Sequence, residues 1–202
     1  VKSMKRSPSF NLLRNPIFLL FIISASLVQS SHAVYYGFGT LLWKSMGHSD
    51  TAIGWLWAEG VLAEILLLFW GGAMLSRLGP TWLLVIAGIA GSIRWIVAGL
   101  ATDLSLLILC QALHAFTFGA THLSAVHFIQ RAAPQDMSAS AQSLYSALGS
   151  GVGFGIMMPI AGYLYEVYGP NAFIFMAAMA ASGTSLALFL IYYWDGERLS
   201  VN

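Results

Sequence analysis

Charged side chains are scarce in this sequence. Only 8% of its 202 residues are Asp, Glu, Lys or Arg, whereas 58% are hydrophobic. A soluble domain carries roughly 25% charged residues, which cover its water-facing surface. This chain cannot cover such a surface, so we expect it to lie in a lipid bilayer. The net charge of +1 and the lack of a basic patch give no indication of a nucleic-acid partner.

Catalytic and metal-binding patterns are also missing. A single cysteine, Cys110, excludes an internal disulfide framework. No histidine follows His127, so a serine in the later segments lacks the histidine that an intramembrane serine protease needs after it. His114, His122 and His127 are eight and five residues apart, which is a poor spacing for a zinc site on a helix. No phosphate-binding glycine loop is present. The sequence therefore predicts no enzyme, no metal site and no cofactor.

Long hydrophobic runs are what the chain has in place of charge. A membrane-spanning helix needs about 20 predominantly apolar residues. Six runs of this kind occur, separated by short segments rich in Gly, Pro and charged residues. The expected spans are residues 17–43, 51–76, 81–100, 104–130, 138–165 and 171–194. The predicted fold class is an all-α membrane protein with six transmembrane helices.

Basic residues are distributed unevenly between the two sides of the membrane. Six spans place both termini on one side. That side holds seven basic residues, namely Lys2, Lys5, Arg6, Arg14, Arg77, Arg131 and Arg198. The other side holds only Lys44. The positive-inside rule then predicts cytoplasmic termini, in a bacterial-type inner (plasma) membrane. Four tryptophans near span ends, Trp43, Trp55, Trp57 and Trp82, are expected to be interfacial aromatics.

Ionisable side chains lie deep inside four of the spans. His32, Glu64, Arg94 and His114 are at comparable depth in the first four spans, and Glu59 lies about 7 Å nearer the outer side than Glu64. Charges inside a membrane usually face a bundle interior or a water-filled cavity and pair with one another. We therefore expect a shared cavity in which a carboxylate holds Arg94, with Glu64 favoured over Glu59. The alternative for Arg94 is a purely structural ion pair with Glu59 or Glu64. The alternative for Glu59 is that it lies near the interface and reaches water.

Helical spacing groups further polar residues on two faces. In the first span, Gln29, His32 and Tyr36 fall on one face about 60° wide. In the fourth span, residues spaced three, three and four apart form a polar stripe, Gln111, His114, Thr117 and Thr121. His122 lies about 80° from His114 on the same helix. Packing and a cavity role both stay open for His122, and also for Trp95 next to Arg94.

Five blocks of the sequence resemble a known family. They are "QSSHAVYYGF" (29–38), "GWLWAEGVLAEILL" (54–67), "GSIRWIVAG" (91–99), "QALHAFTFGATHL" (111–123) and "AQSLYSALGSGVG" (141–153). In this order they resemble the C-terminal half of the phenylpropionate permease group, proton-symporter-like members of the major facilitator superfamily. The resemblance covers roughly residues 10–198. Residues that match the group's pattern are His32, Tyr35, Tyr36, Glu64, Arg94, Gln111, His114 and His122.

The resemblance implies a fold and a function. The fold would be one half of a transporter, a six-helix unit with a 3+3 inverted repeat, whose substrate site lies between two such halves. Residues 1–16 would be a cytoplasmic linker from a missing N-terminal half, 17–194 the C-terminal half, and 195–202 a cytoplasmic tail. The expected function is part of a proton symporter for a small organic solute such as an aromatic carboxylate. A sugar or nucleoside symporter, or a self-contained six-helix channel or scaffold, is the alternative.

The depth and helical faces of the polar residues, together with the resemblance, suggest roles for individual residues. Glu64, Arg94 and His114 are expected to couple transport to protons. The expected substrate-binding residues are Gln29, His32, Tyr35, Tyr36, Trp95, Gln111 and His122. More distantly, the chain resembles the sugar symporters of the lactose permease type, in which a Glu, an Arg and a His on the corresponding helices handle sugar and proton. Thr117 stands here where those symporters have a carboxylate three residues after the His, so that proton-carrying role has no match.

Overall fold

The computed structural model describes residues 11–200, without the side chains of residues 74–76. The expected basic residues Lys2, Lys5 and Arg6, and most of the expected linker, lie outside the described part. Every regular element within residues 11–200 is helical. Five stretches are long and apolar enough to cross a membrane: Pro16–Ser45, Asp50–Ala73, Arg77–Leu100, Leu104–Ala132 and Gln135–Tyr193. The first four match the first four expected spans, and the fifth, of 59 residues, contains the last two.

The first stretch is two helices, not the single helix expected for 17–43. α2 covers Pro16–Ser30, and α3 covers Ala33–Ser45. At the start of α2, the Asn15 side chain accepts hydrogen bonds from the backbone N–H groups of Ile17 and Phe18. The expected span is confirmed, but it is interrupted after Ser30, where side chains hydrogen-bond to backbone carbonyls. The Ser31 hydroxyl donates to the Val28 carbonyl at 2.6 Å, and a ring nitrogen of His32 lies 3.0 Å from the Gln29 carbonyl.

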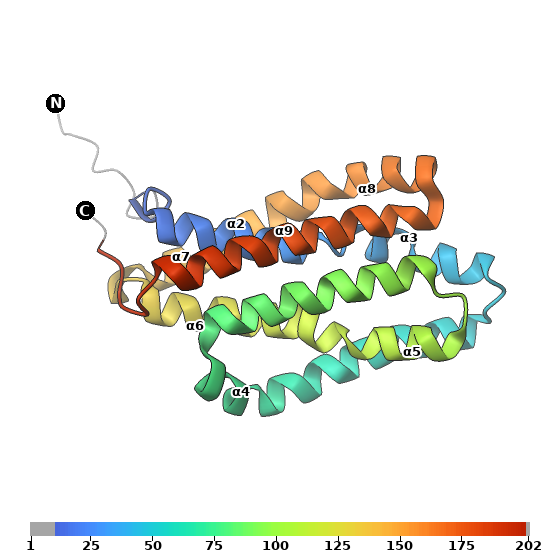
Figure 1. The fold of residues 1–202 in the computed structure, drawn as a ribbon, viewed down its shortest axis with the longest axis horizontal. Helices are drawn as coiled ribbons and strands as arrows, with labels where there is room; N and C mark the ends of the chain where they lie inside the picture. The colour runs from blue at the N-terminus through green and yellow to red at the C-terminus, as the bar shows by residue number, and fades with distance from the viewer. Residues whose placement is uncertain (1–10, 201–202) are drawn as a thin grey trace.

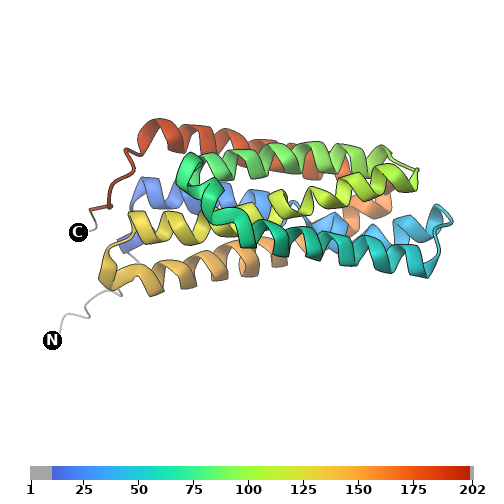
Figure 2. The ribbon, with the colours of Figure 1, turned by 90° about the horizontal axis from the view of Figure 1, so that it is seen from below.

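A sharp reversal divides α4, which covers Asp50–Leu100. Gly79 has a φ of 73°, in the left-handed region that favours glycine, and Pro80 then opens the second segment. At the opposite end, the Ser49 side chain caps the first segment by accepting from the Ala52 N–H. The residues "RLGP" therefore form a tight turn between two antiparallel helical segments, as Figure 2 shows.

The remaining helices contain two π-helical segments. One continuous helical stretch is made of α5 (Leu104–Ala112), η1 (Ala115–Ala120) and α6 (Thr121–Ala132). After the short turn η2 (Gln135–Met137) come α7 (Ser138–Tyr145), η3 (Ser146–Gly153) and α8 (Phe154–Tyr168). The turn η4 (Gly169–Asn171) reverses the chain into α9 (Ala172–Tyr193). η1 and η3 are wider turns of a kind that is frequent at functional sites.

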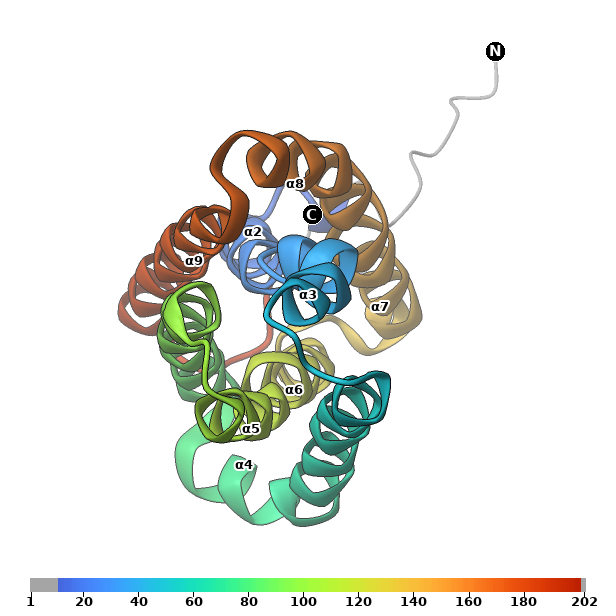
Figure 3. The ribbon, with the colours of Figure 1, turned by 90° about the vertical axis from the view of Figure 1, so that its right-hand side faces the viewer.

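The helices form an elongated bundle in which the start of α2 and the end of α9 lie at the same end (Figure 1). Seen along its length, α2, α3 and α6 lie inside a ring formed by α4, α7, α8 and α9 (Figure 3). Two apolar cores fill the bundle. One contains Phe18, Phe21 and Phe128, and the other contains Trp43 and Phe173. Along α2–α3 and α5–α6, buried polar residues lie between the segments that contribute to each core.

Candidate functional site

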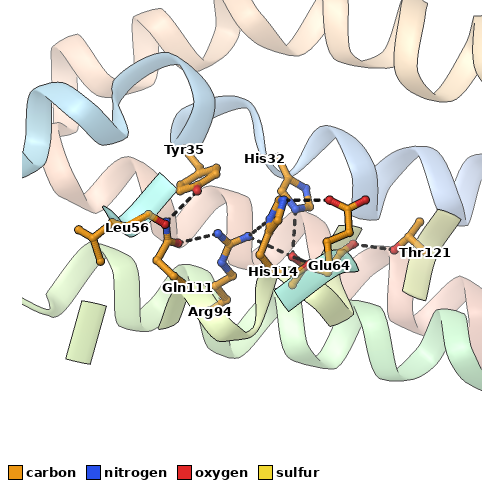
Figure 4. Close-up of polar contacts among 9 residues, drawn as sticks. His32, Tyr35, Leu56, Glu64, Arg94, Gln111, His114 and Thr121 are labelled. Atoms are coloured by element: carbon orange, nitrogen blue, oxygen red, sulfur yellow. Dashed lines mark hydrogen bonds and ion pairs between the residues drawn. The ribbon is translucent and has the colours of Figure 1, made fainter. Parts of the chain in front are cut away.

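Arg94 is the centre of the buried polar cluster and is fully inaccessible to solvent. Its Nη1 donates to His114 Nδ1 at 2.9 Å and to the Thr117 hydroxyl at 3.0 Å. Its Nη2 donates to the side-chain amide oxygen of Gln111 at 2.8 Å (Figure 4). Three members of the expected polar stripe on the fourth span therefore hold one guanidinium. Thr121, the fourth member, donates to the Thr117 carbonyl of its own helix at 2.7 Å.

Aromatic rings enclose the guanidinium. Its Cζ atom lies 4.4 Å from the centroid of the Tyr35 ring and 4.6 Å from that of the Trp95 ring, which is cation–π geometry. Gln111 fixes Tyr35, because its side-chain N–H donates to the Tyr35 hydroxyl at 2.9 Å and to the Leu56 carbonyl at 3.0 Å. Trp95 packs in the core, where its indole N–H donates to the Ser31 hydroxyl at 2.8 Å. Trp95 therefore packs beside the break between α2 and α3 and also contacts the Arg94 guanidinium.

His114 lies between Arg94 and Glu64. Because arginine only donates hydrogen bonds, Nδ1 of His114 must accept, and the ring proton is assigned to Nε2. That Nε2 atom lies 3.7 Å from a carboxylate oxygen of Glu64. Glu64 and His114 have 19% and 6% of their side chains exposed, so Glu64 is the more accessible partner. The direct Arg94–carboxylate pair expected from the sequence is not formed in this conformation, since an imidazole stands in its place.

Two glycines lie where α4 approaches the helix of His114. A Cβ atom on Gly119 would lie 3.3 Å from Glu64 Cγ and 3.2 Å from Leu67 Cδ2. A Cβ on Gly60 would lie 3.5 Å from three atoms of the His114 side chain. The absence of a side chain at Gly119 therefore lets α4 come close enough to the helix of His114 for the carboxylate to reach the imidazole, whereas a Cβ on Gly60 would make ordinary van der Waals contact.

His32 joins the cluster from the opposite side. Its Nδ1 faces the Gln29 carbonyl and must donate, so Nε2 accepts from the Thr117 hydroxyl at 3.1 Å. A directed chain of hydrogen bonds therefore runs from Arg94 through Thr117 and His32 to the backbone at the helix break. His32 was expected to bind substrate, but in this conformation it is fully buried and both ring nitrogens are occupied.

The other expected binding residues are spread more widely. Gln29 is buried beside the helix break, and its side-chain oxygen has no hydrogen-bond partner among the described residues. Tyr36 is 40% exposed, and its ring stacks on that of Trp57 at 5.9 Å. His122 is exposed on another face of α6 and makes no hydrogen bond or ion pair within residues 11–200. It therefore takes no part in the hydrogen bonds of the cluster.

Some neighbours of the site were missed from the sequence. Trp57 was expected at the membrane interface, but its indole N–H donates to the Thr40 hydroxyl at 3.0 Å and its ring packs on Tyr35 and Tyr36. Phe118 stacks on His114 at 5.5 Å between ring centroids. Its position four residues after His114 was the available signal for Phe118. Among the described residues, no group of three His, Cys, Asp or Glu side chains could hold a metal ion.

Comparison with known proteins shows the family to which the chain belongs. The model of the MFS_1 like family, part of the major facilitator superfamily, matches residues 1–177. The chain belongs to this family. It is 37% identical over 160 residues to the probable 3-phenylpropionic acid transporter of Escherichia coli K12. The aligned residues are 79% of this chain and 42% of that protein. The resemblance to the phenylpropionate permease group is confirmed.

More distant relatives are also transporters. The uncharacterized transporter YwbF of Bacillus subtilis is 23% identical over 181 residues, covering 89% of this chain and 45% of that protein. The maltose permease of Geobacillus stearothermophilus is 26% identical over 191 residues, covering 94% of this chain and 46% of that protein. The chain thus spans less than half the length of each of these relatives. It is an integral membrane protein of a family of transporters, not of enzymes.

Proposed function

We propose that the chain is part of a proton-coupled symporter for a small organic solute. The observation that carries the proposal is the line Glu64–His114–Arg94, in which an accessible carboxylate reaches a fully buried guanidinium through one imidazole. A buried arginine without a direct carboxylate partner is costly inside a membrane and is usually functional. The family relationship supports transport, and the geometry supports a role for protons and charge.

The architecture that goes with this function is a six-helix C-terminal half. The reversals at Gly79 and Gly169 support six crossings, the last two being α7–η3–α8 and α9. We propose residues 17–194 as this half, 1–16 as the linker before it and 195–202 as its tail. Of the described basic residues, Arg14 precedes α2, Arg77 lies at the reversal of α4, Arg131 lies in the last turn of α6 and Arg198 follows α9, whereas Lys44 lies in the last turn of α3. This distribution supports cytoplasmic termini.

Coupling follows from charge balance at the cluster. Ionised Glu64 supplies a negative charge that is connected to Arg94 through His114. When Glu64 takes up a proton, that negative charge is lost and the Arg94 cation is left uncompensated in a low-dielectric site. An incoming carboxylate would restore the balance. One proton and one carboxylate would therefore bind together, with His114 as the group that transmits the change.

The aromatic surroundings favour a flat organic anion. The rings of Tyr36 and Phe118 lie next to His114, and that of Trp57 stacks on Tyr36. The name of the Escherichia coli relative, 3-phenylpropionic acid, describes a flat organic anion. The maltose permease relationship supports a sugar as the second candidate, with Gln111 and His114 as hydrogen-bonding groups. Uptake of radiolabelled 3-phenylpropionate and of maltose by cells producing the full-length protein separates the two solutes.

Proton coupling is tested by Glu64→Gln in the full-length protein, reconstituted into proteoliposomes. We expect this variant to lose uphill accumulation driven by a proton gradient and to keep solute exchange, because the glutamine cannot gain or lose the proton. Accumulation against a gradient by Glu64→Gln would contradict the proposed coupling role. The channel or scaffold alternative is tested with the 202-residue chain alone, for which we expect no solute uptake.

A further inference from the structure

A second polar feature lies at the end of the bundle, far along the helices from Arg94. A cavity of about 380 Å³ is formed where α4 reverses and α6 ends. Its walls include Arg77, Gly79 and Pro80 of α4, and His127, Gln130 and Arg131 of α6. None of these residues belongs to the transport cluster described above.

The cavity is lined by positive charge that lacks a negative partner. No carboxylate is among its lining residues, and no ion pair joins Arg77 or Arg131 to an acidic group in the described part of the chain. Both arginines are exposed to solvent. Arg131 leans over the turn, since its Nη1 lies 3.9 Å from the point that a Cβ on Gly79 would occupy. Two guanidinium groups from different helices therefore converge on one hollow.

The start of a helix adds to this positive potential. The second segment of α4 begins at Pro80, so its free N–H groups and the positive end of its dipole lie at the cavity. Helix starts of this kind bind phosphate groups. The Pro80 carbonyl accepts a hydrogen bond from the Ser124 hydroxyl at 2.7 Å, which ties this helix start to α6 and fixes the two walls together.

The depth of the cavity matches that of lipid headgroups. It lies at the end of two membrane-spanning stretches, Arg77–Leu100 and Leu104–Ala132. Trp82, two residues after Pro80, is 47% exposed, as expected for an aromatic residue at the membrane interface. Leu78, in the cavity wall, is also exposed, at 39%. Charged and apolar groups therefore meet there as they do in a phospholipid headgroup region.

We propose that this cavity binds a phosphate group, in the membrane that of an anionic phospholipid headgroup. Arginine presents paired N–H groups that fit two oxygens of a phosphate, and Arg77 and Arg131 would clasp it from opposite helices. Gln130 and His127 would add hydrogen bonds from the α6 side. Basic hollows between membrane helices are known to recognise anionic headgroups. A bound lipid would hold the α4 reversal against α6.

The test measures lipid binding to the full-length protein in neutral detergent by native mass spectrometry. Phosphatidylglycerol is titrated against phosphatidylcholine, and inorganic phosphate is added as a competitor. We expect phosphatidylglycerol to bind in preference to phosphatidylcholine. Replacing both arginines, Arg77→Gln with Arg131→Gln, should weaken that binding about 30-fold, given roughly 1 kcal/mol for each basic residue near a headgroup. Arg198→Gln, which removes an exposed charge outside the cavity, should change it less than about twofold.

Each outcome bears on the proposal. Displacement of phosphatidylglycerol by millimolar inorganic phosphate would support the same site with free phosphate as a ligand, and no displacement would identify the lipid as the source. Equal binding by the parent and the double variant, or equal weakening by Arg198→Gln, would overturn the proposal. If the double variant aggregates on gel filtration, the single variants replace it, each with an expected loss of about fivefold.

Discussion

Two glutamates five residues apart on α4 have very different surroundings. Glu64 lies 3.7 Å from His114, which is hydrogen-bonded to Arg94. Glu59 lines a mostly apolar hollow of about 540 Å³ between α4 and α5, next to Trp55 and Ile108. It has no hydrogen bond or ion pair with any residue that the structure describes. Both residues are glutamates on the same helix, so their different surroundings arise from the side chains that the neighbouring helix places opposite each of them.

Rotation and spacing explain the contrast. Five residues turn an α-helix by about 140°, so the two side chains point to different neighbours. Opposite Glu64, Gly119 leaves room for the carboxylate to approach the polar stripe. Opposite Glu59, the neighbouring helix offers Leu104 and Ile108, which cannot hydrogen-bond. A carboxylate in a membrane span therefore indicates a functional site only when the facing helix supplies partners. The following predictions test this contrast in the full-length protein.

The largest effect is expected for Arg94→Lys. Lysine lacks the planar fork that reaches His114, Thr117 and Gln111 at once. Leaving one of these buried acceptors unpaired should lower both accumulation and exchange by about 10- to 100-fold. Proteoliposome uptake measures both. Arg198→Lys is the control at an exposed site, and Arg94→Lys transport within twofold of the parent would show that charge alone suffices.

A smaller loss is expected for Thr117→Val. The valine removes the oxygen that accepts from Arg94 and the hydroxyl that donates to His32. An interhelical hydrogen bond of this kind in a membrane protein is worth up to about 1.7 kcal/mol, so the initial uptake rate should fall about tenfold. Thr121→Val is the matched control, because that hydroxyl bonds only within its own helix. Equal losses in both variants would mean that packing, and not the Arg94–His32 connection, sets the rate.

Gly119→Ala should weaken transport less. The added methyl group would press on Glu64 and Leu67 and displace the carboxylate from His114. Overpacking by one methyl costs about 1 kcal/mol, which corresponds to about fivefold in the accumulation ratio. Gly54→Ala on α4, where nothing lies within 4 Å, serves as the control. Unchanged accumulation by Gly119→Ala would show that the close approach of the two helices is dispensable.

The smallest effect is expected for Glu59→Gln. Because Glu59 has no polar partner in the described structure, losing its charge should change accumulation less than about twofold. The measurement is the same proton-driven uptake that Glu64→Gln is expected to abolish. A loss at Glu59 as large as that at Glu64 would remove the distinction between the two carboxylates.

Much of the fold could be predicted from the sequence, because membrane helices obey simple rules of length and polarity. The hydrophobic runs predicted the helical stretches to within a few residues. The spacing of Gln111, His114 and Thr117 predicted the face that meets Arg94. The break after Ser30 was not predicted, because its carbonyls are satisfied by Ser31 and His32, and no proline or glycine marks it. Hydropathy does not detect side-chain hydrogen bonds to the backbone.

The partners of the charged groups were decided by tertiary structure. By itself, the sequence determined that the chain lies in a membrane and that Glu64, Arg94 and His114 share a depth. It did not determine that His114 stands between the other two, or that His122 faces away. These outcomes depend on the rotation of each helix about its axis and on the close approach at Gly119. Helix rotation is set by packing against neighbours that are distant in the sequence, so only the assembled bundle fixes which polar groups meet.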